Sequence, residues 1–234
     1  KPWHVPQRPI ERLELPEFNL RHLSALTDDT GILTYARFAT PNREYGYNVE
    51  CNAQALAVTG TYSRLWQDES MQPAMQRYLA FLSHGLNRKS HWFRNNLTYD
   101  HRWQKERANE EAHARAMLGL GLTVKSAPEE AVRNMATSLF IEALPPVRGF
   151  KSPKALAYAI IGLHSYLEVY GGDAAARRLR GNLSQKLMAL FDKNSEDDWP
   201  WCADAVTGHA ACIPHALLLA GQWIPDADMF ETGM

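Results

Sequence analysis

The chain has 234 residues, of which 45% are hydrophobic and 22% charged, and its formal net charge is -1. These values are typical of a globular protein and exclude a disordered one. The near-zero charge and the lack of a basic block argue against nucleic acid as a partner, and no apolar run approaches the ~18 residues of a membrane span.

Cysteine usage and the first residues bear on the compartment. Three cysteines are too few for a disulfide scaffold, and an odd number favours a reducing environment. The chain shows no signal peptide but begins with Lys1. We therefore expect a cytoplasmic protein, or a periplasmic one if a leader has been removed.

Helical periodicity dominates the chain, and few segments have the pattern of a strand. Apolar residues recur at steps of three and four, which predicts helices. The predicted helices span residues 72–86, 127–139, 155–169 and 173–192. Pro128 suits the first turn of the second of these, because its missing N–H is not needed there.

A weak internal repeat organises these helices. Four segments rich in Ala, Gly and Leu, at residues 52–58, 113–121, 155–163 and 210–221, follow one another at roughly 40–60 residues, the size of a helical hairpin. Each is followed by a more amphipathic segment. The sequence therefore predicts an all-α ring or stack of hairpins, with small apolar inner helices and amphipathic outer ones.

The loops before the inner helices combine aromatic rings with carboxylates, amides or arginine. They span residues 37–47, 91–100 and 197–204. Aromatic faces stack on the apolar C–H face of a sugar, and polar groups bond its hydroxyls. If the hairpins form a ring, these loops meet at one end of its axis, which favours carbohydrate as the ligand.

Several blocks resemble a bacterial (α/α)-barrel family of the six-hairpin glycosidase-like type. This family occurs next to glycosyltransferase domains and enzymes of mannoside metabolism. The blocks are Leu26-Thr-Asp-Asp-Thr-Gly-Ile-Leu, Ala36-Arg-Phe-Ala-Thr-Pro-Asn-Arg-Glu-Tyr-Gly-Tyr, Asn52-Ala-Gln-Ala-Leu, Tyr99-Asp-His-Arg-Trp, Asn109-Glu-Glu-Ala-His-Ala-Arg-Ala and Trp199-Pro-Trp-Cys-Ala-Asp. The resemblance implies an (α/α) toroid over residues 26–234, incomplete relative to six hairpins, with residues 1–25 as an N-terminal extension packing on it. It also implies an oligosaccharide or glycoside ligand and a glycosyltransferase domain as a partner.

The chain departs from the family pattern at polar positions. The family has two adjacent acids where this chain has Glu50 and Cys51, an Arg at Gln54, a Gly at Ala114, and an acid and an Arg in the segment that begins at Thr207. These losses favour a non-catalytic binding or scaffold module as an alternative to a glycoside hydrolase. A sugar epimerase is a further alternative, although only His113 is well placed for it.

Glycoside hydrolysis requires two carboxylates on either side of the scissile bond. Asp100 follows an aromatic loop, and Glu110 and Glu111 open an inner helix, whose N-terminus stabilises an anion. We predict Asp100 and Glu111 as the acid/base pair, with Glu110 as the substitute. The structural alternative is that both glutamates only serve the first turn of the helix.

The predicted substrate-binding residues share these blocks. Arg43, Tyr47, Glu50, Asn52, Trp103, His113, Arg115, Trp199, Trp201 and Asp204 are the candidates. The aromatic ones, together with Trp92 and Phe93, serve either as stacking platforms or as the packed rim of a barrel. His113 is either a ligand-binding group or a buried residue with satisfied hydrogen bonds.

We expect no cofactor and no metal. The chain has no Gly-rich phosphate loop and no Ser or Cys nucleophile motif. Cys202, His209, Cys212 and His215 are zinc-type ligands, but their spacing matches no common zinc module. Pro214 is moreover expected to break the local helix.

Overall fold

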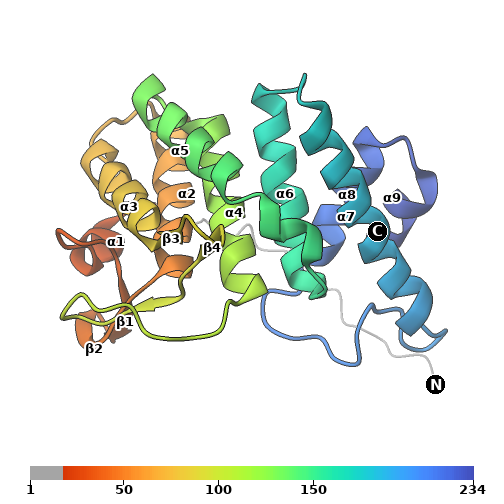
Figure 1. Ribbon diagram of the computed structural model, residues 1–234, viewed down its shortest axis with the longest axis horizontal. Coiled ribbons are helices and arrows are strands. Elements are labelled where there is room, and N and C mark those ends of the chain that lie inside the picture. The colour runs from red at the N-terminus through yellow and green to blue at the C-terminus, as the bar shows by residue number, and fades with distance from the viewer. Residues whose placement is uncertain (1–17) are drawn as a thin grey trace, which may run out of the picture.

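The computed structural model describes residues 18–234, which form four helical hairpins in two layers (Figure 1). The inner layer consists of α2 (Val49–Trp66), α4 (Glu110–Ser126), α6 (Pro153–Val169) and α8 (Cys212–Trp223). The outer layer consists of α3 (Gln72–Gly85), α5 (Glu130–Glu142), α7 (Ala174–Asn194) and α9 (Ala227–Gly233). Each inner helix packs on the next inner helix and on the outer helix that follows it in sequence. The predicted order of small inner and amphipathic outer helices is confirmed.

The helix positions agree with the periodicity except at one boundary. Three of the four predicted helices correspond to α3, α6 and α7. The predicted start of α5 is wrong, because Ala127 ends α4 with a bond from its N–H to the carbonyl of Thr123, and α5 begins at Glu130. The expected break at Pro214 is also wrong: this proline lies in the first turn of α8, where a missing N–H is tolerated.

Glycines allow the first three inner helices to pack backbone against backbone. A Cβ added at Gly119 would lie 2.4 Å from the carbonyl oxygen of Ala53 on α2. One at Gly121 would lie 2.2 Å from the carbonyl oxygen of Gly162 on α6, and one at Gly162 would lie 2.7 Å from that of Met117 on α4. No side chain larger than hydrogen fits at these positions. The small residues of the repeat thus set the spacing of α2, α4 and α6.

Short strands cover the amino-terminal ends of α2 and α4. Strands β1 (Leu33–Arg37), β2 (Thr40–Asn48) and β5 (Asn96–Leu97) form an antiparallel sheet in the order β1-β2-β5, and β3 (Leu86–Asn87) pairs with β4 (Trp92–Phe93). The expectation of a loop over residues 37–47 is wrong, because β2 occupies most of it. Its exposed side chains hid the alternation that marks a half-buried strand. A short helix, α1 (Arg21–Leu26), precedes the sheet, and a 3₁₀ turn (Pro145–Gly149) follows α5.

The all-α class is confirmed, with the small sheets as an addition. The inner helices run as a row in which α2 and α8 lie towards opposite ends of the longest axis (Figure 1). Of the predicted N-terminal extension, residues 1–17 lie outside the described part of the chain. Phe18 stacks on Tyr62 and Trp66 of α2, with ring centroids 5.6 and 5.2 Å apart. Within residues 18–234, no helix is long and apolar enough to cross a bilayer.

Candidate functional site

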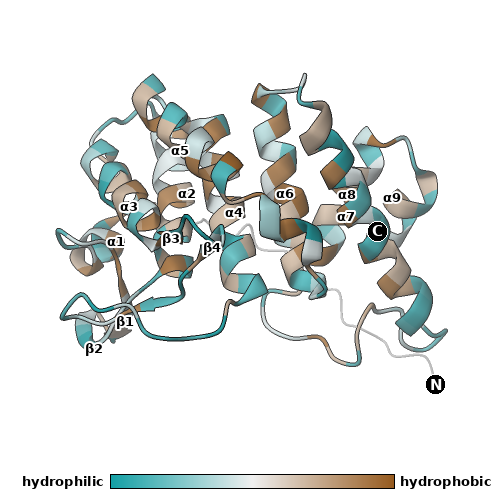
Figure 2. Ribbon diagram, in the orientation of Figure 1, coloured by the Kyte–Doolittle hydropathy of each residue, from teal (hydrophilic) through white to brown (hydrophobic). Residues whose placement is uncertain are grey.

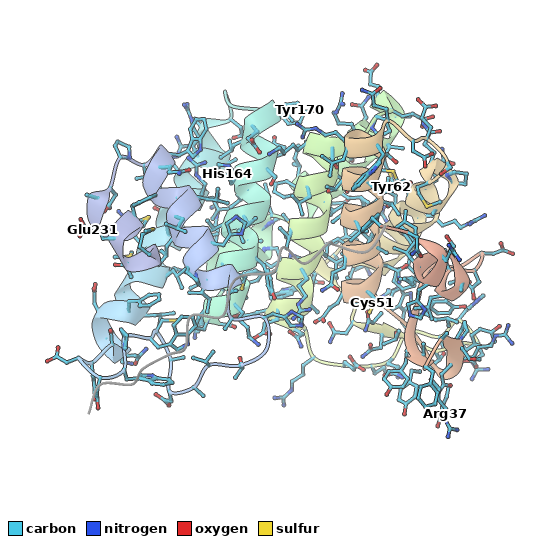
Figure 3. All side chains as sticks on the ribbon, turned by 180° about the vertical axis from the view of Figure 1, so that it is seen from behind. Arg37, Cys51, Tyr62, His164, Tyr170 and Glu231 are labelled. Atoms are coloured by element: carbon cyan, nitrogen blue, oxygen red, sulfur yellow. The ribbon has the colours of Figure 1, made fainter. Side chains whose placement is uncertain are left out.

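The predicted site residues gather mainly at one face of the molecule, the amino-terminal ends of the inner helices. This face is the lower edge of Figure 1, where the segment from β5 to α4 and the segment from α7 to α8 run below the helices. The first of these segments is mostly hydrophilic (Figure 2). In the view from behind, Cys51 marks this end of α2 and Tyr62 the opposite end (Figure 3).

A row of polar side chains crosses the face from α2 to α8. Arg115 of α4 lies 3.6 Å from the Glu50 carboxylate of α2, and its guanidinium lies 5.1 Å from the ring centroid of Tyr158 on α6. Burial raises the pKa of Tyr158 to about 12, and the Cys212 thiol of α8 lies beside its hydroxyl. Within the described residues, Nε of Arg115 is buried without a hydrogen-bond partner. These four residues, the polar row, connect all the inner helices.

Both predicted catalytic glutamates hold α4 against the start of α6. The Glu110 carboxylate accepts hydrogen bonds from the backbone N–H groups of Lys151 and Ser152, at 2.8 and 2.9 Å. The Glu111 carboxylate forms an ion pair with Lys154 at 3.0 Å and accepts the Ser152 hydroxyl proton at 3.0 Å. Glu110 thus caps α6 from a neighbouring helix. Glu111 is the more available of the two for a ligand, since its side chain is 30% exposed and both of its partners are side chains rather than backbone groups.

Asp100, the predicted partner of Glu111, belongs to a separate exposed turn. Its carboxylate accepts the hydroxyl proton of Thr98 and pairs with Arg102 at 3.0 Å. The Thr98 hydrogen bond lowers the pKa of Asp100, so this carboxyl group is ionised at neutral pH and unsuited to act as a general acid. No hydrogen bond or ion pair in the described chain joins Asp100 to Glu111. Each acid pairs with a different basic residue, and their use as an acid/base pair stays a prediction.

Three predicted binding residues are buried and serve the fold. Asn52 accepts the N–H of Ile32 at 3.0 Å and donates to the carbonyls of Ile32 and Asn48, which fixes the sheet to α2. Tyr47 donates its hydroxyl proton to Asp28 at 2.6 Å, and its pKa is raised by burial first and by this carboxylate second. These residues are structural, and the prediction that they contact substrate is not supported.

His113 is the third buried residue, and its ring is held between two backbone groups. Nδ1 accepts the N–H of Phe93 at 3.2 Å, and Nε2 lies 2.9 Å from the carbonyl of Ala143. Burial lowers the pKa of His113 to about 4, so the ring is neutral with its proton on Nε2. Trp92 and Phe150 pack against it. It cannot act as the acid or base of an epimerase, because neither ring nitrogen is available.

Two further candidates lie on the sheet side of the face. The guanidinium of Arg43 lies 5.5 Å from the ring centroid of Tyr99. Trp103 packs on Phe81 and donates its indole N–H to Nε2 of His84 at 3.3 Å. Trp103 thus fills the rim between the sheet and α3, which is the structural alternative for a predicted stacking ring.

The last three candidates lie on the segment between α7 and α8. Trp199 is 40% exposed and donates its indole N–H to the carbonyl of Ala203 at 2.9 Å, and Asp204 is exposed. Trp201 lines a cavity of about 660 Å³, here called the Trp201 cavity. Of the predicted aromatic platforms, Trp201 has the most space for a ligand beside it.

The Trp201 cavity contains functional groups that the sequence did not single out. Its lining includes two acids, Asp192 of α7 and Glu231 of α9, and two hydroxyl residues, Ser195 and Thr232. Unlike the acids of α4, Asp192 and Glu231 have no side-chain hydrogen bond or ion pair within residues 18–234. In the view from behind, Glu231 lies at the left edge of the molecule (Figure 3). No local pattern could have found these acids, because each lies near the end of an amphipathic helix, where a solvated carboxylate is ordinary.

The first turn of α8 connects the polar row with the Trp201 cavity. Pro214 lines the Trp201 cavity, and Cys212, two residues earlier, ends the polar row. The sequence did not single out Tyr158 of the row or Lys154, the partner of Glu111, because on α6 they interrupt a segment that is otherwise apolar on nearly all sides. Their spacing of four residues on one helix face was the available signal.

The zinc alternative is not supported. Among the described residues, no three His, Cys, Asp or Glu side chains converge as a metal site would require. Cys202 is buried and its carbonyl accepts a bond from Asn194, whereas Cys212 lies against Tyr158. The four residues that suggested zinc are therefore not gathered around one point.

Comparison with known proteins gives no match, either to a protein family or to a curated protein. The resemblance to the (α/α)-barrel family therefore stays a prediction.

Proposed function

We propose that the protein binds carbohydrate, and that its ligand, an oligosaccharide or glycoside, occupies the Trp201 cavity. One observation carries this proposal: the cavity is lined by the indole of Trp201, by the acids Asp192 and Glu231, which form no ion pair within residues 18–234, and by Ser195 and Thr232. An indole face suits the C–H face of a pyranose, and carboxylates accept hydrogen bonds from sugar hydroxyls. A volume of about 660 Å³ is in the range of small-molecule sites and has room for more than one sugar ring.

The proposal includes the architecture in which this cavity lies. We propose that the row α2-α4-α6-α8 is an arc of an (α/α) toroid, in which the amino-terminal ends of the inner helices form the functional face. The consecutive packing of inner helices and the polar row across them support it. Association with a glycosyltransferase domain, which the sequence resemblance implies, belongs to the same proposal.

Glycoside hydrolysis is the second candidate function. One observation favours Asp192 and Glu231 as its acid and base over Asp100 and Glu111, the pair predicted from the sequence. Asp192 and Glu231 are contributed by two different helices to one cavity, and no other side chain of the described residues neutralises them. A hydrolase needs two carboxylates with a sugar between them. In this reading they replace Asp100 and Glu111 as acid and base.

The test is a titration of mannose- and glucose-based oligosaccharides into the purified chain, with the reducing ends released measured in the same samples. We expect binding that weakens about tenfold, or about 1.4 kcal/mol, in Trp201→Ala. The matched control is Trp223→Ala, which removes another exposed indole from the neighbouring part of the molecule and is expected to leave sugar binding unchanged.

The outcomes separate the two candidates. Binding without release of reducing ends supports the binding protein, whereas release that stops in Asp192→Asn and Glu231→Gln supports the hydrolase. Equal binding by wild-type protein and Trp201→Ala, or no binding by a chain that unfolds cooperatively, would contradict the proposal.

A further inference from the structure

A second cavity lies at the other end of the hairpins, away from the proposed sugar site. It has a volume of about 200 Å³ and lies between the carboxyl-terminal parts of α6 and α8 and the amino-terminal half of α7. Its lining includes His164, Glu168, Arg177, Arg180 and Trp223. His164, labelled in Figure 3, marks its place towards the upper end of the helices, opposite Cys51.

Arg180 is the buried charged residue of this cavity, and within residues 18–234 no carboxylate pairs with it. The residue is only 7% exposed, and no ion pair connects it to an acid of the described chain. Its Nε is buried without a hydrogen-bond partner in residues 18–234, and its nearest polar contact is a long one, 3.5 Å from Nη1 to Nδ1 of His164. A buried guanidinium without a counter-charge is costly, so such groups are normally paired.

The neighbours of Arg180 add positive rather than negative potential. Arg177, one turn earlier on α7, lines the same cavity, and its charge contributes to lowering the pKa of Arg180, after burial. Glu168 is the acid on the cavity wall, but it forms an ion pair with Lys125 at 2.6 Å.

We propose that this cavity binds a small oxyanion, a phosphate or carboxylate group, with Arg180 as its principal ligand and Arg177 as the second. The fork of N–H donors on an arginine matches either oxyanion through two parallel hydrogen bonds. The indole of Trp223, which packs edge-on against His164 with ring centroids 5.8 Å apart, forms an apolar wall beside the anion. The ligand is therefore an anionic group that carries an apolar or cyclic portion, and it is distinct from the sugar of the Trp201 cavity.

The test uses inorganic phosphate and sodium acetate as probes, titrated calorimetrically into the full chain at constant ionic strength. Three variants are compared: Arg180→Met, Arg177→Met, and Arg178→Met as the control. Arg178 lies on the same helix but lines a different cavity, so its replacement makes the same charge change outside the proposed site. We expect Arg180→Met to weaken binding at least about tenfold, Arg177→Met to weaken it less, and Arg178→Met to leave it unchanged.

Thermal unfolding without added anion gives a second readout that a purely structural arginine would not produce. Removing an uncompensated buried charge should leave the melting temperature of Arg180→Met equal to or above that of the wild type. Phosphate should then raise the melting temperature of Arg180→Met less than it raises that of Arg178→Met, which keeps the site.

Binding of phosphate alone or acetate alone identifies the oxyanion and supports the proposal. Absence of binding by both probes, or equal weakening in the Arg178 variant, would overturn it. If Arg180→Met does not fold, Arg177→Met decides: unchanged binding in that variant overturns the proposal, and weakened binding supports it.

Discussion

Polar residues have different surroundings in two regions of the molecule, around α2, α4 and α6 and around α7, α8 and α9. Around α2, α4 and α6, backbones pack in contact through glycines, and three of the polar side chains are bound to the fold: Asn52 to the sheet, His113 to two backbone groups, Glu110 to the start of α6. Around α7, α8 and α9 the packing leaves cavities of about 660 and 200 Å³.

The residues that line those cavities include groups without partners in the described chain. Asp192 and Glu231 have no ion pair, and Nε of Arg180 has no hydrogen bond. The acids most conspicuous in the sequence, Glu110 and Glu111, thus stabilise the fold, whereas Asp192 and Glu231 line a cavity where helix packing is looser.

The largest effect is expected from Gly162→Leu in the tightly packed region. A side chain there would collide with the backbone of α4 at Met117, which cannot move without separating two inner helices. We expect the free energy of unfolding to fall by about 4 kcal/mol, measured by urea denaturation. Gly181→Leu on α7, where no atom lies within 4 Å of the added Cβ, is the control and should gain about 0.5–1 kcal/mol. Equal losses in the two variants would contradict the difference in packing.

The next largest effect is a loss of stability in acid caused by His113. Its pKa of about 4 in the folded protein lies below the ordinary value of 6.5, so the unfolded chain binds the proton more tightly. This contribution to stability is present above pH 6.5 and is lost as the pH falls towards 4, by about 3 kcal/mol in total.

Urea denaturation between pH 4 and pH 7 measures this effect. His113→Gln, which does not titrate, should be less stable than the wild type at pH 7 but should lose less stability on acidification. A wild-type curve parallel to that of His113→Gln would show that His113 titrates normally and is not held between its two backbone partners.

A smaller effect is expected from Glu110→Gln. This change removes the charge that accepts the N–H groups of Lys151 and Ser152 before α6, and we expect a loss of about 1 kcal/mol in the free energy of unfolding. Glu130→Gln, in the exposed first turn of α5, is the control and should change stability by a few tenths of a kcal/mol. If Glu110→Gln instead leaves stability unchanged and alters sugar binding, its role is functional and the comparison fails.

Most of the helices were predictable because periodicity is a local property. The steps of three and four around Met75 and Leu79, and the small residues around Gly162, are visible without the fold. The strand β2 was missed because most of its side chains are exposed, so no alternation of apolar and polar residues marks it.

The site was less predictable because its partners come from distant parts of the chain. Glu110 resembles a catalytic acid at a helix N-terminus until its contact with residues 41 and 42 positions later is known. Arg180 resembles an ordinary surface arginine of an amphipathic helix, and only the packing of α6 and α8 around α7 buries it. Trp201 was predicted, since its aromatic loop is a local signal, but the carboxylates that share its cavity were not.

The most direct test of the account compares one residue from each region in a single titration of a sugar that the chain binds. Trp201→Ala and Glu111→Gln both alter predicted site residues, but only Trp201 lines a cavity with unpaired carboxylates. We expect Trp201→Ala to weaken sugar binding about tenfold and Glu111→Gln to bind the sugar as the wild type does. Binding lost in Glu111→Gln and retained in Trp201→Ala would contradict this expectation and assign the sugar to the start of α4.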